Sequence, residues 1–335
     1  MFFYNEIKRH NLYTKTLLIS SLTMINRRHI RIKVMQSAYA LLLSENDKLD
    51  SQEKFLLESI EKLHQLYVLQ YKLLIALHQK ATEFFDVSQH KHIYSGDISE
   101  TSSNFVKNKV LLQFKNSVSL ALYPVKKKET DWQNFPEIVN IIWSQILASR
   151  SFTKYLKIEN PDFYADKKYV HTLFKEIIAP NEHLAEFFES EVITWVDDIP
   201  FVNTWIINNL NLMTPTGTFI LDPLYKDPDD KDFALQLFRK TILNYSKYEI
   251  EIDGKTPNWD SERITKIDKL LMVMGIAEFL NFPSIPTKVT INEYIELAKD
   301  YATQKSSFFI NGVLDKIVED YNKEEKIQKV GRGLL

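Results

Sequence analysis

Apolar residues in the first quarter of the chain recur at the spacing of amphipathic helices. Ile32, Met35, Tyr39 and Leu42 follow one another at intervals of three and four positions, which places them on one face of a helix. A second and longer apolar face follows Ser51, which can cap a helix. Its members are Phe55, Leu56, Ile60, Leu63, Tyr67, Leu74 and Leu77. Since residues 1–92 contain no proline or glycine, we predict long helices here.

The last third of the chain has the most regular pattern. A helix is predicted from Ser261, Pro283 and Pro286 end it, and a capping box from Thr290 to Glu293 predicts the start of the next helix. A final helix follows, and an interior glycine in it, Gly312, indicates that another helix crosses closely there. The lysine-rich residues that close the chain are expected to form a loose tail.

Between these regions, helical segments alternate with breaks marked by prolines. Glycine supports a helical interpretation, because the chain has only seven among 335 residues and tight hairpins and bulges depend on glycine. We therefore predict an all-α protein in which strands are nearly absent.

Composition narrows the possible chemistry. The chain has no cysteine, which excludes disulfides, thiolate metal sites and cysteine nucleophiles and fits a cytoplasmic protein. No apolar run approaches the roughly 20 residues of a membrane helix. The chain contains no G-x-S-x-G, H-E-x-x-H or G-x-G-x-x-G sequence, so we expect no catalysis, no cofactor and no metal site. A net charge of −2 means that a polyanion would need a local basic patch.

Such a patch is present at the start of the first predicted helix. Arg27, Arg28, Arg31 and Lys33 place four cations and no anion within seven residues, and Arg27 and Arg31 share a helix face. Cations at a helix N-terminus oppose the helix dipole, and a bound phosphate would offset that cost. We predict that the three arginine side chains are exposed. The alternative from the residues alone is an ordinary solvated first turn.

Two stretches of sequence have a more specific pattern. In the first, the arginine cluster is followed by Gln36-Ser37-Ala38-Tyr39. The second reads I-P-T-K-V-T-I-N-E-Y-I-E-L-A-K from Ile285, and F-I-N-G-V-L-D-K follows from Phe309. Together they resemble the NusB family of transcription antitermination factors, with its Q-A-L-Y-like, V-P-x-K-V-x-I-N-E-x-I-E-L-A-K and F-V-N-G-V-L-D-K segments.

The resemblance implies an all-α fold of NusB-like helical bundles with a large helical insertion in the N-terminal half. On this basis residues 24–256 are expected to form an N-terminal helical subdomain that contains the insertion at about 49–230. A C-terminal subdomain of 257–322 and a flexible tail of 323–335 would follow. Residues 1–23 precede Met24, where family members commonly begin, and are expected to be dispensable.

The resemblance also implies a function in RNA binding rather than catalysis. Family members bind boxA of nascent ribosomal RNA together with the ribosomal protein NusE on RNA polymerase. Matching positions imply RNA contacts by Arg27, Arg28, Arg31, Lys33, Tyr39 and Phe309, and partner contacts by Asp268 and Glu278.

Several alternatives stay open. Ordinary helix packing favours a core position for Phe309, and Asp268 alone indicates a helix-surface carboxylate. The whole chain could instead be a protein-interaction scaffold. It could also be a domain like those that precede RNA cytosine methyltransferases, without their catalysis.

Overall fold

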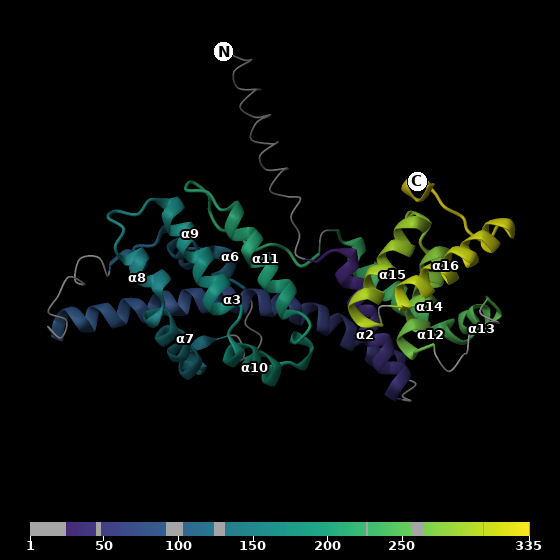
Figure 1. Cartoon of the computed structure of the whole chain (residues 1–335), viewed down its shortest axis with the longest axis horizontal. Coiled ribbons are helices and arrows are strands. Elements are labelled where there is room, and N and C mark those ends of the chain that lie inside the picture. The colour runs from purple at the N-terminus through teal and green to yellow at the C-terminus, as the bar shows by residue number, and fades with distance from the viewer. Residues whose placement is uncertain are drawn as a thin grey trace, which may run out of the picture. The chain divides into compact units, whose positions relative to one another are not determined.

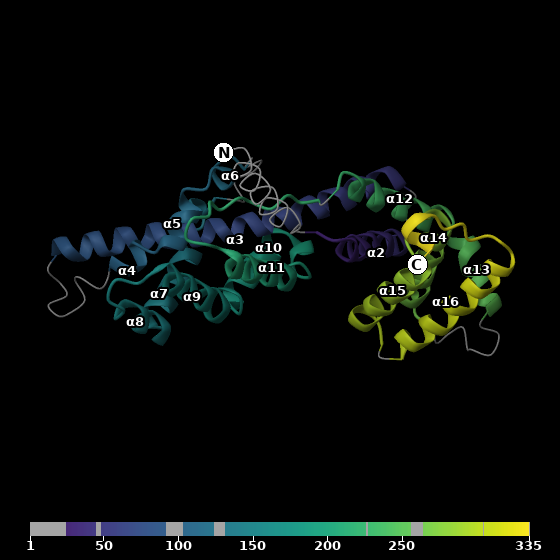
Figure 2. The same cartoon turned by 90° about the horizontal axis from the view of Figure 1, so that it is seen from above.

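The computed structural model describes residues 25–44, 48–91, 103–123, 131–225, 227–255, 264–303 and 305–334. These residues form helices joined by turns and contain no strand, which confirms the all-α prediction. The predicted N-terminal extension, residues 1–23, lies outside the described residues. The chain divides into two compact units: unit 1, which is Met1–Ile60 with Leu224–Leu335, and unit 2, which is Glu61–Pro223. Figures 1 and 2 show the helices of both units.

Unit 1 is a bundle built around one central helix. Its helices are α2 (Arg27–Ser44), the first part of α3 (Leu49–Lys91), α12 (Asp229–Leu243), α13 (Tyr245–Lys255), α14 (Lys266–Asn281), α15 (Thr287–Tyr301) and α16 (Ser306–Lys323). Helix α14 packs against α2, α12, α13, α15 and α16. Its residues from Leu270 to Phe279 are all buried, as expected for a helix that is apolar on every side.

The predictions of a capping box at Thr290 and of a close helix crossing at Gly312 are wrong. Helix α15 begins at Thr287, after Pro286, so Thr290 lies inside the helix and does not cap it. Its hydroxyl donates to Glu278 Oε1 at 2.7 Å instead. The close helix crossing is at Gly275, where an added Cβ would lie 3.1 Å from Leu314 Cδ2, whereas one at Gly312 would meet nothing within 4 Å.

The end of the chain is not a loose tail. The Val330 amide donates to the Pro283 carbonyl at 3.0 Å, and Lys329 Nζ donates to the Phe282 carbonyl at 3.0 Å. A short 3-10 helix, η6 (Gly331–Leu334), follows, and a Cβ at Gly333 would lie 1.9 Å from the Pro283 carbonyl oxygen. The segment therefore docks on the turn between α14 and α15, where the Phe282 and Pro283 carbonyls accept its hydrogen bonds.

Unit 2 is assembled on the remainder of α3. Around it lie α4 (Ser103–Val106), α5 (Lys109–Lys115), α6 (Val118–Ala121), η2 (Trp132–Asn134), α7 (Pro136–Ala148), α8 (Arg150–Leu156), α9 (Phe163–Leu173), the π-helix η3 (Phe174–Ile178), α10 (Glu182–Glu191), η4 (Ile193–Trp195) and α11 (Ile199–Leu212). Two tyrosines of α3, Tyr67 and Tyr71, are completely buried and pack edge to face. Indole groups also fix α3: Trp132 donates to the Leu69 carbonyl at 2.8 Å and Trp195 to the Lys62 carbonyl at 2.7 Å.

The two units divide the chain differently from the expected subdomains. The expected insertion covers about 49–230, whereas the compact unit is Glu61–Pro223. The regions on either side of residue 256 belong to one unit and share a core that includes Val34, Phe238 and Leu271. No described helix is long and apolar enough to cross a membrane.

Candidate nucleic-acid interface

The first turn of α2 presents two arginines that are partly exposed. Arg27 Nε donates to Asp230 Oδ1 at 3.2 Å, and its guanidinium lies 4.9 Å from the centre of the Phe233 ring. Arg28 binds Glu293 in a bidentate pair, through Nε at 2.9 Å and Nη2 at 3.0 Å. The two arginine side chains remain 39% and 43% exposed. Each guanidinium is thus oriented by a carboxylate and keeps N–H groups available to a ligand.

Arg31, expected to be exposed, is buried. Its side chain is 3% exposed and pairs with the completely buried Glu278, through Nε at 2.8 Å and Nη2 at 2.6 Å. Tyr294 and Thr290 also donate to this carboxylate. Burial by itself would lower the pKa of Arg31, but the charge and hydrogen bonds of Glu278 outweigh it and hold that pKa above its ordinary value. Arg31 therefore joins α2 to α14 and α15 inside the core.

Lys33, one of the expected RNA contacts, is also buried. Its exposed fraction is 2%. Helix α2 packs against both α12 and α14, so two of its faces are covered. Arg31 and Lys33 are about 200° apart around the helix, and each lies on a covered face. The basic cluster of the sequence thus has two exposed and two buried members.

Tyr39 lies apart from the exposed arginines. It is eleven residues beyond Arg28, a rise of about 16 Å along α2. There it lines a groove of about 330 Å³ in unit 1. The other lining residues are Leu42, Leu43, Tyr245, Glu249, Ile264, Lys266 and Lys269. Apolar side chains from α2 and charged ones from α13 and α14 therefore share this groove.

The two phenylalanines at the start of α16 have different environments. Phe309 packs against the core of unit 1 and is partly buried, whereas Phe308 is 82% exposed. Sequence reasoning missed Phe308. The signal was available, because adjacent residues of a helix are 100° apart and the core positions Ile310, Val313 and Ile317 fix which side faces inward.

The two carboxylates expected at a partner interface are both buried. Asp268 is not a surface residue: it closes a capping box with Thr265 at the start of α14, each side chain accepting from the other residue's backbone amide. Glu278 is the partner of Arg31 described above. In the described chain neither carboxylate is open to a second protein. Among the described residues, no group of three or more histidines and carboxylates is placed to hold a metal ion.

Comparison with known proteins identifies a family for the part of the chain that supplies most of the core of unit 1. The model of the NusB family matches residues 206–319. The transcription antitermination protein NusB of Salinibacter ruber is 41% identical over 113 residues, which are 34% of this chain and 71% of that protein. The chain belongs to the NusB family.

Two further relatives match over a smaller share of their length. The protein of the same name from Chloroherpeton thalassium is 39% identical over 35% of this chain and 55% of its own. That from Clostridium kluyveri is 41% identical over 30% of this chain and 62% of its own. No solved structure matches the chain. Since the family match begins at residue 206, most of unit 2 lies outside it.

Proposed function

We propose that this NusB-family chain is a transcription antitermination factor that binds single-stranded boxA RNA of nascent ribosomal RNA. The observation that carries the proposal is the pair of oriented, partly exposed guanidiniums at the first turn of α2. Arg27 uses only Nε for Asp230, and Arg28 uses Nε and Nη2 for Glu293. Their other N–H groups can donate to phosphate oxygens, and a planar guanidinium suits that geometry.

An exposed aromatic ring supports the same proposal. Proteins bind single-stranded RNA by stacking its bases on aromatic side chains. Phe308 offers such a ring at the start of α16. Helix α16 packs against α15, which carries the Glu293 that holds Arg28. We call Arg27, Arg28 and Phe308 the RNA surface. In this assignment Arg31 and Lys33 support the surface from within, and Phe309 fixes the start of α16.

The partner NusE would occupy the groove beside Tyr39. Asp268 is buried, but Lys266 and Lys269 on the same turn of α14 line this groove. Leu43 is exposed at its edge and Tyr39 forms part of its wall. Apolar side chains bordered by charges of both signs are typical of protein interfaces. RNA and NusE would then bind different surfaces of unit 1, as an adaptor on RNA polymerase requires.

The test is a titration of boxA RNA with Arg27→Ala/Arg28→Ala, with and without NusE. Loss of two phosphate contacts should reduce the magnitude of the log–log salt slope by about 1.4, at roughly 0.7 per contact for a single strand. Arg27→Lys/Arg28→Lys keeps the charge and should recover the slope but only part of the affinity, because lysine cannot bind bidentately. Lys154→Ala/Lys157→Ala, two exposed residues of unit 2, is the matched control.

Thermal melting must show that the variants are folded, since Asp230 and Glu293 each lose an ion pair. An unchanged affinity and slope in a folded double variant would exclude the RNA surface. If the wild-type chain shifts no boxA RNA even with NusE, the scaffold alternative replaces the proposal.

A further inference from the structure

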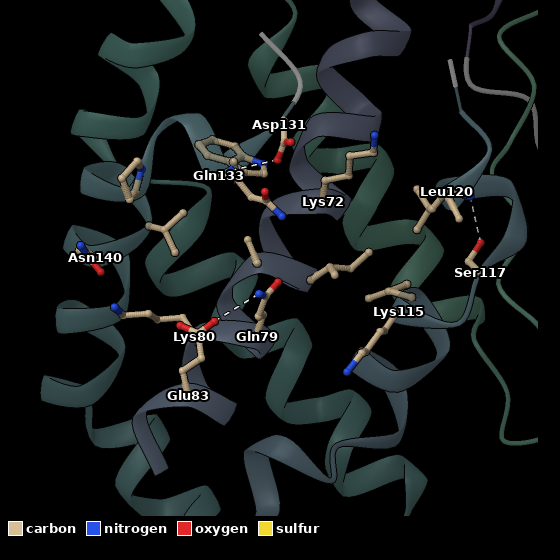
Figure 3. Close-up of a pocket in the computed structure, with 17 residues that line it drawn as sticks. Lys72, Gln79, Lys80, Glu83, Lys115, Ser117, Leu120, Asp131, Gln133 and Asn140 are labelled. Atoms are coloured by element: carbon tan, nitrogen blue, oxygen red, sulfur yellow. Dashed lines mark hydrogen bonds between the residues drawn. The ribbon is translucent and has the colours of Figure 1, made fainter. Parts of the chain in front are cut away.

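A pocket of about 610 Å³ lies within unit 2, outside the matched family region. One of its walls is a single face of α3 that includes Lys72, Gln79, Lys80 and Glu83. Lys115 comes from the end of α5, and Asp131 and Gln133 from the start of η2 (Figure 3). Its volume is within the usual range of 300–1,000 Å³ for sites that bind small molecules.

The lysines that line the pocket outnumber its carboxylates. Three lysines, Lys72, Lys80 and Lys115, line it, against the two carboxylates of Glu83 and Asp131. Both carboxylates already accept a hydrogen bond, from the Gln79 amide at 3.2 Å and from the Gln133 backbone amide at 3.0 Å. Of the residues that the structure describes, no carboxylate lies within 4.0 Å of any of the three ammonium groups. Burial lowers the pKa of Lys72, with partial compensation by Asp131.

The floor and the rim of the pocket differ in chemistry. Buried apolar side chains form the floor: Phe114, Leu120, Trp132 and Val139. The rim carries the lysines together with the amides of Gln79, Gln133 and Asn140. An apolar floor with a few polar groups around it is the usual construction of a site for an amphiphilic small molecule. Here the ligand would place an apolar ring on the floor and its negative charge at the rim.

The spread of the cations indicates an elongated anion. Lys72 and Lys80 are eight residues apart on α3, which separates them by about 12 Å along the helix. Figure 3 shows the three ammonium groups on different sides of the pocket. We propose that this pocket binds a nucleotide, with its base on the apolar floor, its phosphates on the lysines and the base edge read by the rim amides. The nucleotide can be free or part of an RNA chain. This proposal does not depend on the function assigned to unit 1.

The experiment measures binding to the full chain by calorimetry at fixed salt. The probes are ADP, CDP, inorganic pyrophosphate and a short single-stranded RNA without a boxA sequence. Lys72→Gln/Lys115→Gln removes two cations, and Ala76→Leu fills the α3 wall without changing charge. Each variant should weaken nucleotide binding at least about tenfold, through lost charge-assisted hydrogen bonds or lost space. Lys154→Gln/Lys157→Gln makes the same charge change outside the pocket and should bind as the wild type does.

Weaker nucleotide binding in both pocket variants supports the proposal. Tighter binding of ADP or CDP than of the RNA identifies a free nucleotide as the ligand, and the reverse order identifies RNA. Absence of binding to every probe overturns it. Binding that the pocket variants leave unchanged, or binding of pyrophosphate as tight as that of ADP, also overturns it, because the floor would then contribute nothing. Arg27→Ala/Arg28→Ala should leave ADP binding intact, so failure here is distinguishable from failure of the RNA surface.

Discussion

At the residue scale, two arginines three positions apart on α2 have different roles. Arg28 holds Glu293 at the surface, whereas Arg31 is enclosed with Glu278. A guanidinium can be buried only with a partner, and removal of one member of a buried pair typically costs about 3–5 kcal/mol. Glu278 is 247 positions away from Arg31 in sequence. The local pattern of four cations therefore does not reveal which cation is buried with Glu278.

His29, between these arginines, should make stability depend on pH. Burial, with the positive charges of Arg28 and Lys33, lowers the pKa of His29 to about 4 from 6.5. Above pH 6.5 this histidine is neutral in both folded and unfolded chains. Between pH 6.5 and 4 only the unfolded chain binds the proton, so the free energy of unfolding should decrease by about 1–3 kcal/mol as pH falls. Denaturant unfolding at pH 7 and pH 5 should show a smaller decrease for His29→Gln. An equal decrease in both proteins would contradict this.

The phenylalanine doublet of α16 should separate binding from stability. Phe308→Ala should weaken boxA binding by about 1–3 kcal/mol, the value of one base stack, with a small effect on the melting temperature. Phe309→Ala should instead lower the free energy of unfolding by about 1–3 kcal/mol, since it removes a side chain packed on the core. RNA titration and denaturant unfolding of both variants check this. A loss of affinity confined to folded Phe309→Ala would return the stacking role to Phe309.

At the element scale, the sequence predicts which segments are helical better than it predicts their contacts. Periodicity identified α2, α3 and α16, because burial of one face dictates the spacing of apolar residues. Thr290 and Glu293 match the local pattern of a capping box. However, α15 already begins after Pro286, one turn earlier, and the Thr290 hydroxyl donates to Glu278. The prediction of a loose tail is wrong for a similar reason. The carbonyls that accept its hydrogen bonds, those of Phe282 and Pro283, are remote in sequence. The predicted site residues divide into exposed and buried ones for the same reason, because helices that are distant in sequence decide which side chains are covered.

Gly275 in α14 and Gly312 in α16 should respond in opposite directions to alanine. Gly312→Ala adds a methyl group that meets nothing within 4 Å, so the free energy of unfolding should rise by up to about 1 kcal/mol through helix propensity. Gly275→Ala places its Cβ 3.1 Å from Leu314 Cδ2, and Leu314 is fully buried. It should be destabilising because a packed core resists such a shift. Denaturant unfolding of both variants compares them, and equal effects would show that α14 and α16 adjust freely.

At the scale of the whole molecule, unit 2 has the organisation of an inserted domain. His64 and Asp222, near its two ends, are in contact: His64 Nε2 lies 2.9 Å from the Asp222 carbonyl oxygen. The Asp222 carboxylate also accepts from Tyr67 at 2.8 Å, Trp205 at 2.9 Å and Asn209 at 2.6 Å. The chain therefore begins and ends unit 2 at one place, as tolerated insertions do. In unit 1, the buried core cluster takes all its members from residues 25–60 and 233–321.

Unit 1 should consequently fold without unit 2. We expect a chain in which a short glycine–serine linker replaces Glu61–Pro223 to remain helical and to melt cooperatively, because its core and its RNA surface are complete. Its affinity for boxA RNA should stay within about threefold of the full chain, a difference below 1 kcal/mol. Circular dichroism and RNA titration measure both. Asp222→Ala in the full chain is the control, since it should destabilise unit 2 and leave RNA binding unchanged. A folded excision variant that no longer binds boxA would assign an essential RNA contact to unit 2.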